Sequence, residues 1–206
     1  MPAALLVARP CAAAAPGAAA RRPPRAAAGP AAEARRLRLR HAATGATFSG
    51  TYHDGRAPDP SAMAELSMVL ADHRSGQSRP FDPAAIDILW ELGRRQGMDE
   101  FVILSGYRTV ATNAAVGGAG DSQHLQARAL DVQLPAARLA SFGEAAIALG
   151  RGGVGIYPTH GFVHLDSGPV RRWGGFGRTL SGRDRPRPTD RVGRIAEAWA
   201  QANRRR

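Results

Sequence analysis

The sequence predicts an α+β domain in which a small, mainly antiparallel sheet is flanked by helices. Short segments that alternate apolar and polar residues indicate strands, and two Asp-Pro pairs, each followed by an apolar stripe, indicate helix starts. These segments are interspersed along the chain, and two pairs of strands are close enough in sequence to form hairpins. Since hairpins join strands antiparallel, this order favours a mainly antiparallel sheet.

The first predicted elements are a hairpin and two helices. Residues 36–42 alternate strictly, residues 43–45 offer a turn, and residues 46–55 alternate again. The Asp-Pro pairs at 59–60 and 82–83 each place a capping residue before a proline that suits the first helical turn. The first helix has the apolar stripe Met63, Leu66, Met68, Val69 and Leu70.

The remaining predicted elements are three strands and a helix, followed by a tail. Residues 101–104 form a short apolar run suited to a buried strand, and residues 127–134 are typical of another strand. A helix is expected over 135–149. Residues 152–157 and 161–166 are then expected to pair as the last two strands.

Composition divides the chain into three parts. A length of 206 residues allows one domain with a core, plus tails. Residues 1–34 are low in complexity and are predicted to be a leader or a disordered segment. Residues 35–175 are predicted to be the folded domain, and residues 176–206 an Arg/Pro-rich tail with a possible terminal helix over 191–203.

The net charge of +11 does not indicate a nucleic-acid-binding domain, because the basic residues lie at the ends. Residues 1–40 hold eight arginines and one acid, and residues 168–206 hold eleven arginines and three acids. The central residues 41–167 are acidic, with thirteen acids against nine arginines. We therefore expect no specific nucleic-acid partner. One cysteine excludes an internal disulfide, and no apolar run approaches the roughly 20 residues of a membrane helix.

Three polar residues are candidates for a metal site. Strand residues alternate between faces, so His164 and Asp166 share one face while their neighbours point into the core. If the strand that carries Asp131 is adjacent, Asp131 and His164 can converge, and His124 can arrive from the preceding turn. Two imidazoles and one carboxylate suit a zinc ion whose fourth position is left for water.

The sequence also resembles a known family. The resemblance lies in three blocks, in order and at compatible spacing: SGYRTVATN (105–113), SQHLQARALDVQLP (122–135) and GGVGIYPTHGFVHLDSGPVRRW (152–173). They are similar to the MepK-like (YcbK-like) murein endopeptidases, which belong with the zinc D-Ala-D-Ala carboxypeptidases and the hedgehog signalling domain. The likeness covers about residues 35–175. It implies the zinc D-Ala-D-Ala peptidase/hedgehog-like fold.

The resemblance implies a zinc-dependent hydrolase of cell-wall peptide crosslinks. It implies that His124, Asp131 and His164 bind one zinc ion, and that Arg108 holds the scissile carbonyl oxygen or a substrate carboxylate. A fixed guanidinium near a metal is suited to stabilising an oxyanion. The implied substrates are peptidoglycan stem peptides, and the implied location is the periplasm or outside the cell. We expect a monomer.

Further residues are candidates for substrate contacts. Ser122 precedes the first ligand by two residues and is expected to contact substrate or to orient the loop. Tyr107 is a candidate substrate-binding residue, and Trp173 a candidate cleft residue. The glycines of residues 152–155 are expected to allow close backbone approach.

The proton acceptor is less well defined by the sequence. Relatives often carry an acid or histidine two or three residues before the last ligand, where this chain has Phe162 and Gly161. Asp166 is the preferred substitute, either as a base for the attacking water or as a residue that fixes a metal ligand. His160 is a lower-ranked candidate base.

Three other functions remain open at this point. A protein of the same fold can bind peptidoglycan without cleaving it. The three filled ligand positions favour activity, whereas the missing acid before His164 favours binding alone. A non-haem iron oxygenase also uses two histidines and one carboxylate. However, its distant histidine normally follows the His-x-Asp pair, whereas His124 precedes it, and the predicted strands are too few for a jelly roll. A nucleic-acid binder that uses the Arg-rich tails would lose function when the tails are removed.

Overall fold

The computed structural model describes residues 33–175, and the predicted terminal helix over 191–203 lies outside this range. Within it, seven strands form one sheet in the order β2-β1-β3-β4-β6-β5-β7. The strands are β1 (Arg35–His41), β2 (Thr47–His53), β3 (Glu100–Ser105), β4 (Ala129–Gln133), β5 (Gly153–Tyr157), β6 (Phe162–Asp166) and β7 (Arg171–Gly174). The helices are α1 (Pro60–Val69), α2 (Pro83–Gln96), α3 (Val110–Ala115) and α4 (Ala136–Leu149), with short 3-10 helices η1 (Gln123–Gln126) and η2 (Pro158–His160).

The predicted hairpin is confirmed. β1 and β2 pair antiparallel, and the alternation of the sequence matches the burial of their side chains. Leu37 and Leu39 of β1 are buried, as are Phe48 and Tyr52 of β2, whereas the alternating arginines Arg36, Arg38 and Arg40 are exposed. One face of the hairpin therefore belongs to the core and the other faces solvent.

Both Asp-Pro helix starts are also confirmed. Asp59 accepts a hydrogen bond from the backbone N–H of Ala62, and Asp82 accepts one from that of Ala84. Each aspartate thereby satisfies an amide that has no partner within its helix. The predicted stripe of α1 is wrong at Met68, which is 61% exposed, because three consecutive residues cannot all face one side of a helix.

The prediction of a mainly antiparallel sheet is wrong, because the sheet is mixed. β1 pairs with β3 in parallel, and β5 pairs with β7 in parallel. The first parallel pair forms because two helices, α1 and α2, separate β2 from β3 and allow the chain to cross over. The second parallel pair forms because the chain leaves the end of β6, crosses over the start of β5, and then runs as β7 along the edge of β5 that does not pair with β6. The sequence analysis did not predict α3, η1 or β7.

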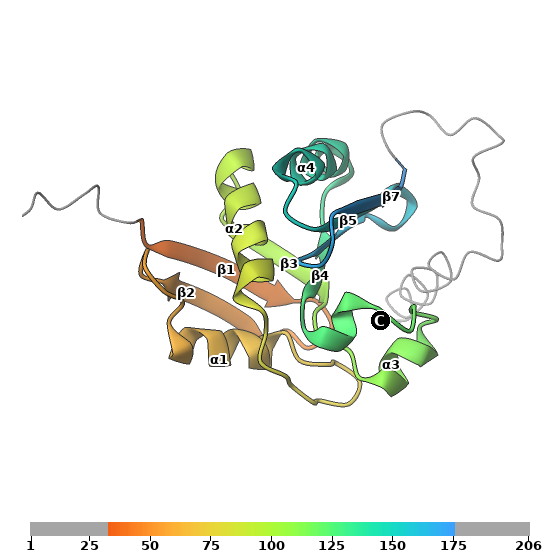
Figure 1. Ribbon diagram of the computed structural model, residues 1–206, viewed down its shortest axis with the longest axis horizontal. Coiled ribbons are helices and arrows are strands. Elements are labelled where there is room, and N and C mark those ends of the chain that lie inside the picture. The colour runs from red at the N-terminus through yellow and green to blue at the C-terminus, as the bar shows by residue number, and fades with distance from the viewer. Residues whose placement is uncertain (1–32, 176–206) are drawn as a thin grey trace, which may run out of the picture. The chain divides into compact units, whose positions relative to one another are not determined.

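The core lies between the sheet and the helices. α2 and α4 contact each other, and both contact β6 (Figure 1). α1 packs against β2, whereas η1 contacts both α3 and β4, whose start it precedes. The buried apolar cluster runs from Leu37 of β1 to Leu165 of β6. Within residues 33–175, no helix is both long enough and apolar enough to cross a membrane.

Candidate metal centre

The two central strands place an aspartate beside a histidine. β4 and β6 pair antiparallel, and Asp131 is the direct partner of His164 in their register. The neighbouring residues on these strands, Leu130, Val163 and Leu165, belong to the apolar core. The alternation of side chains therefore sends Asp131 and His164 to the opposite face of the sheet, as the sequence predicted.

The second histidine comes from η1. The Nδ1 atom of His124 lies 2.6 Å from the carbonyl oxygen of Gly106, and the backbone carbonyl of His124 accepts a hydrogen bond from Arg108 N–H. The chain then turns back toward β4 at Ala127, which has a left-handed φ of 52° and is fully buried. This turn brings His124 over Asp131, seven residues further along the chain.

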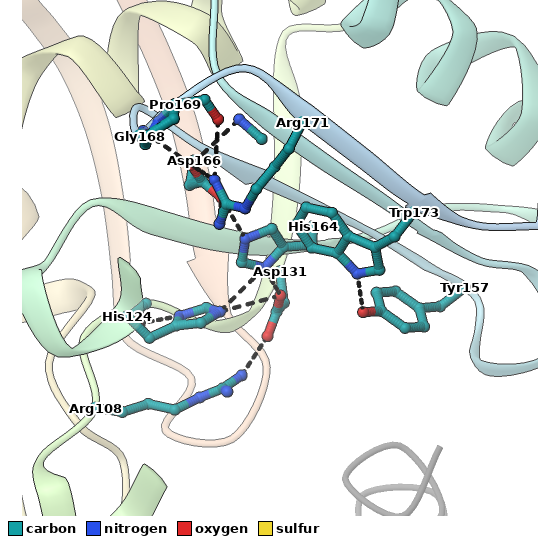
Figure 2. Close-up of polar contacts among 12 residues, drawn as sticks. Arg108, His124, Asp131, Tyr157, His164, Asp166, Gly168, Pro169, Arg171 and Trp173 are labelled. Atoms are coloured by element: carbon teal, nitrogen blue, oxygen red, sulfur yellow. Dashed lines mark hydrogen bonds and ion pairs between the residues drawn. The ribbon is translucent and has the colours of Figure 1, made fainter. Parts of the chain in front are cut away.

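The three predicted ligands converge on one point (Figure 2). His124 Nε2 lies 3.3 Å from Asp131 Oδ1 and 3.2 Å from His164 Nδ1, and the last two atoms are 2.9 Å apart. All three side chains are at least 90% buried. A tetrahedral zinc ion with ligand atoms about 2.0–2.1 Å away would hold those atoms about 3.3 Å apart. The spacing in the cluster fits such an ion.

The hydrogen bonds behind the histidines direct their lone pairs into the cluster. A carbonyl oxygen only accepts, so His124 carries a proton on Nδ1 toward Gly106, and its Nε2 has a free lone pair. His164 Nε2 lies 2.9 Å from Asp166 Oδ2, which fixes a proton on that nitrogen and leaves Nδ1 facing Asp131. Three acceptor atoms therefore meet, and they require one positive charge between them, from a metal ion or a proton.

The electrostatics agree with this requirement. Burial raises the pKa of Asp131, but its contacts with His124 and Arg108 outweigh burial and hold it well below its usual range. Burial and the charge of Arg108 lower the pKa of His124 to about 4. Burial also lowers the pKa of His164, but hydrogen bonds to Asp131 and Asp166 outweigh burial and raise it. The cluster thus keeps an ionised carboxylate and a neutral His124, the forms that bind metals.

Arg108 lies beside this cluster. Its Nη2 donates to Asp131 Oδ2, the oxygen that does not face the histidines, and its Nε donates to Ser105 Oγ over 2.7 Å. Arg108 is only 6% exposed, yet it lines the open cavity above the cluster. It therefore fixes one predicted ligand while remaining next to the space that a substrate would occupy.

Asp166 is fully enclosed. Its side chain has no exposed area, and its Oδ1 accepts hydrogen bonds from the backbone N–H groups of Gly153 and Gly168. Arg171 contacts both of its oxygens. Burial raises the pKa of Asp166, but the hydrogen bond from His164 and the contact with Arg171 outweigh burial and lower it to about 2. Of the two roles considered for Asp166, this environment favours fixing a ligand.

An open cavity of about 400 Å³ lies over the cluster. Its lining includes the three predicted ligands and Arg108, together with Gly118, Ala119, Asp121, Ser122, Gln123, Tyr157, Phe162, Pro169, Arg171 and Trp173. A volume of this size is typical of a small-molecule or peptide site. The cavity gives solvent and substrate access to a cluster that is otherwise buried.

The other predicted site residues divide between the cavity and its surroundings. Ser122 and Trp173 line the cavity, whereas Tyr107 packs against the main core and His160 lies outside the lining, near Phe162. The sequence analysis missed Arg171, which comes from the unpredicted strand β7. The spacing of Arg171 and Trp173 by two residues would have placed both on one strand face.

The glycines of β5 were expected to allow close backbone approach, and the structure places side chains directly on the strand at these positions. A Cβ at Gly155 would come within 2.5 Å of the Trp173 ring, and a Cβ at Gly153 within 2.4 Å of Asp166 Oδ2. Real Cβ atoms do not tolerate such distances, so any side chain at either position would displace a residue that contacts His164.

These features define a class of protein: an α+β domain with two histidines and one carboxylate below an open cavity, the arrangement of a catalytic metal centre. The family described as peptidoglycan L,D-endopeptidase MepK matches residues 29–173. Peptidoglycan L,D-endopeptidase MepK of Escherichia coli K12 is 33% identical over 143 residues, which are 66% of this chain and 79% of the relative. A probable peptidoglycan L,D-endopeptidase MepK of Haemophilus influenzae is 32% identical over 146 residues, 68% of this chain and 78% of the relative. The chain belongs to the MepK family, as its three motifs indicated.

Proposed function

We propose that this protein is a zinc-dependent peptidoglycan L,D-endopeptidase that hydrolyses peptide crosslinks of the bacterial cell wall. The observation that carries the proposal is the convergence of three lone pairs from His124, Asp131 and His164 at the floor of an open cavity. Such a cluster is stable when a cation occupies it, and the cavity admits a peptide to it. Membership of the MepK family supplies the substrate class.

The residues of the cavity divide the work of hydrolysis between them. His124 Nε2, His164 Nδ1 and Asp131 Oδ1 would hold the ion, which, when bound, acidifies a water and polarises a carbonyl. Arg108 fixes Asp131 and places positive charge beside the oxygen on which negative charge develops. Ser122 lines the cavity beside His124 and is available to hydrogen-bond the peptide.

Asp166 acts in this proposal by holding His164 and not as the proton acceptor. Both of its oxygens already accept hydrogen bonds, and the side chain has no exposed area through which water could reach it. A general base must come within hydrogen-bonding distance of the proton that it accepts. His160 is not among the residues that line the cavity.

The proposal extends to the whole chain. Residues 35–175 form the catalytic domain, with residues 1–34 and 176–206 as attached segments. Peptidoglycan stem peptides are the substrates, so the protein acts in the periplasm or outside the cell, as a monomer. The residues that line the cavity run from Arg108 to Trp173 and therefore all lie within this domain.

The test is to incubate the full-length, zinc-loaded protein with purified crosslinked muropeptides and to identify the products by mass spectrometry. Cleavage of an L,D-crosslink by the native protein and not by His164→Ala is the expected result. Binding of muropeptides with intact substrate in both samples would instead establish a peptidoglycan-binding protein without hydrolase activity.

Metal analysis of the purified protein separates the proposal from the oxygenase alternative. We expect about one zinc ion per chain, whereas an oxygenase would hold iron. The fold also favours the peptidase, because the described residues form a single mixed sheet with helices packed on it. A jelly roll consists of two packed antiparallel sheets.

A further inference from the structure

Arg171 on β7 makes a two-point contact with the buried Asp166. Its Nη1 lies 3.0 Å from Asp166 Oδ1, and its Nη2 lies 2.8 Å from Asp166 Oδ2. The Arg171 side chain is 40% exposed, whereas the Asp166 side chain is fully buried. Two parallel, charge-assisted hydrogen bonds fix both the position and the rotation of a carboxylate. Arg171 thus helps to fix where the two oxygens of Asp166 point.

The orientation of Asp166 in turn fixes a metal ligand. Asp166 Oδ2 accepts the proton of His164 Nε2 over 2.9 Å, while Oδ1 accepts backbone hydrogen bonds from Gly153 and Gly168. Rotation of the carboxylate would remove the acceptor from behind His164. The imidazole would then be free to turn its Nδ1 away from Asp131, 2.9 Å across the cluster.

The ring face of His164 is supported from the same strand. The Arg171 guanidinium lies over the Trp173 ring at 5.0 Å, and the Trp173 and His164 rings have centroids 5.2 Å apart. Trp173 Nε1 donates to the hydroxyl of Tyr157, which holds the indole in place. Figure 2 shows Arg171 and Trp173 reaching toward His164 from β7.

We propose that Arg171 is a positioning residue of the metal centre, which acts through Asp166 to hold the His164 imidazole with Nδ1 toward the ion. This inference rests on the proposed metal site and adds a residue that does not hold the ion itself but acts through Asp166 and His164. Loss of a partner behind a metal ligand typically weakens metal binding 10- to 100-fold. Because three of the five hydrogen bonds of Asp166 remain without Arg171, we expect an effect near the lower end, about 10-fold.

The experiment measures zinc affinity of the full-length protein by competition with a chromophoric chelator. Arg171→Gln is expected to bind zinc about 10-fold more weakly than the native protein. Arg171→Lys keeps the charge but loses the two-point contact, so its zinc affinity should lie between those of the native protein and Arg171→Gln. The absorption spectrum of the cobalt-substituted protein should change in Arg171→Gln, because a turned imidazole alters the ligand geometry. Circular dichroism establishes that each variant is folded.

A matched control lies next to Arg171 on the same strand. Arg172 is exposed and points to the other side of β7, so Arg172→Gln changes the net charge equally and should leave zinc affinity and the cobalt spectrum unchanged. An equal loss of affinity in Arg172→Gln would show a general charge effect and would overturn the assignment to Arg171.

A double-mutant cycle tests whether Arg171 acts through Asp166. Asp166→Asn should weaken zinc binding by itself, and adding Arg171→Gln to it should cause little further loss. Losses that simply multiply would overturn the proposed route. Zinc affinities of Arg171→Gln and Arg171→Lys equal to that of the native protein would overturn this inference alone. A native protein that binds no metal would overturn the proposed function as well.

Discussion

Two carboxylates of this protein, the half-buried Asp87 and the buried Asp131, each pair with an arginine but differ in their remaining partners. Asp87 Oδ1 accepts from Arg35 Nη1 over 2.6 Å and from the Tyr52 hydroxyl over 2.7 Å. Asp131 pairs with Arg108, but its other oxygen faces two imidazole lone pairs. The carboxylate of Asp87 is therefore matched by hydrogen-bond donors. Around Asp131, by contrast, acceptor atoms outnumber donors.

The difference separates a structural ion pair from a binding site. The Asp87 cluster ties β1 and β2 to α2, and the Arg35 guanidinium also lies over the Trp90 ring at 5.1 Å. Burial and the hydrogen bond to Asp87 raise the pKa of Tyr52, so its hydroxyl remains a donor. Nothing in this cluster requires a further ligand. The Asp131 cluster, by contrast, requires a cation and opens on a cavity. An arginine–carboxylate pair is therefore not enough to identify a binding site, because both clusters contain one.

The sharpest test of the comparison exchanges each carboxylate for an amide. Asp131→Asn removes an anionic ligand and should lower zinc affinity and muropeptide cleavage by more than about 100-fold, beyond the loss caused by outer partners. Asp87→Asn should lower the free energy of unfolding by about 1–3 kcal/mol and leave zinc affinity unchanged. Chelator competition and urea denaturation measure the two quantities. Equal zinc affinity in the native protein and in Asp131→Asn would contradict the assignment of the site.

Replacing the arginine partner of each carboxylate, Arg108 or Arg35, should give the next largest difference between the two clusters. Arg108→Gln should lower the turnover number for muropeptides by about 100-fold, as expected for loss of a charge beside a developing oxyanion. Arg35→Gln should reduce stability but leave turnover of the folded protein unchanged, since Arg35 lies over Trp90 and away from the cavity. Steady-state kinetics on both variants decide the matter. An unchanged turnover number in Arg108→Gln would limit its role to fixing Asp131.

Much of the site was predictable because alternate residues of a strand lie on the same face of the sheet, so the faces can be assigned from the sequence. Asp131 and His164 could be placed on one face, and the structure makes them direct neighbours. The sequence could not reveal that the Gly106 carbonyl holds His124, because a backbone contact leaves no residue signature. It also suggested Asp166 as a base, and only the structure shows how completely its oxygens are occupied.

The sheet was predicted less well than its strands. The hairpin of β1 and β2 follows from local alternation and a turn, so it was predicted correctly. The parallel pairing of β1 with β3 depends on how two helices pack between them, which is a tertiary effect. β7 consists of RRWG and is mostly exposed, so it has no apolar alternation to reveal it. This omission is why Arg171 was missed.

Added zinc should stabilise the protein only through the acceptor-rich cluster. A ligand that binds the folded state at 100 times its dissociation constant raises the free energy of unfolding by about 2.7 kcal/mol. We expect this increase in the native protein and in Asp87→Asn, and no increase in Asp131→Asn. Thermal unfolding with and without zinc measures it. Equal stabilisation of Asp131→Asn would indicate that zinc binds elsewhere.

A third ionisable group, His41, extends the comparison to a buried side chain that lacks a hydrogen-bond partner on one of its two ring nitrogens. His41 is fully buried; its Nδ1 accepts from the Ala43 N–H, and its Nε2 has no hydrogen-bond partner among residues 33–175. Burial, with a smaller contribution from the charge of His73, lowers its pKa to about 4. The unfolded chain, with an ordinary histidine pKa near 6.5, therefore takes up a proton first as the pH falls.

His41 should consequently make the protein less stable in acid. Its contribution to stability is complete above about pH 6.5 and decreases toward pH 4, by about 2 kcal/mol between pH 7 and 4.5. His41→Asn keeps an acceptor for the Ala43 N–H but does not titrate, so its free energy of unfolding should fall by about 2 kcal/mol less over this range. Urea denaturation at both pH values, with chelator present to exclude metal, measures the difference. The same acid sensitivity in both proteins would show that His41 does not resist protonation, and that burial without partners is less costly here than its surroundings indicate.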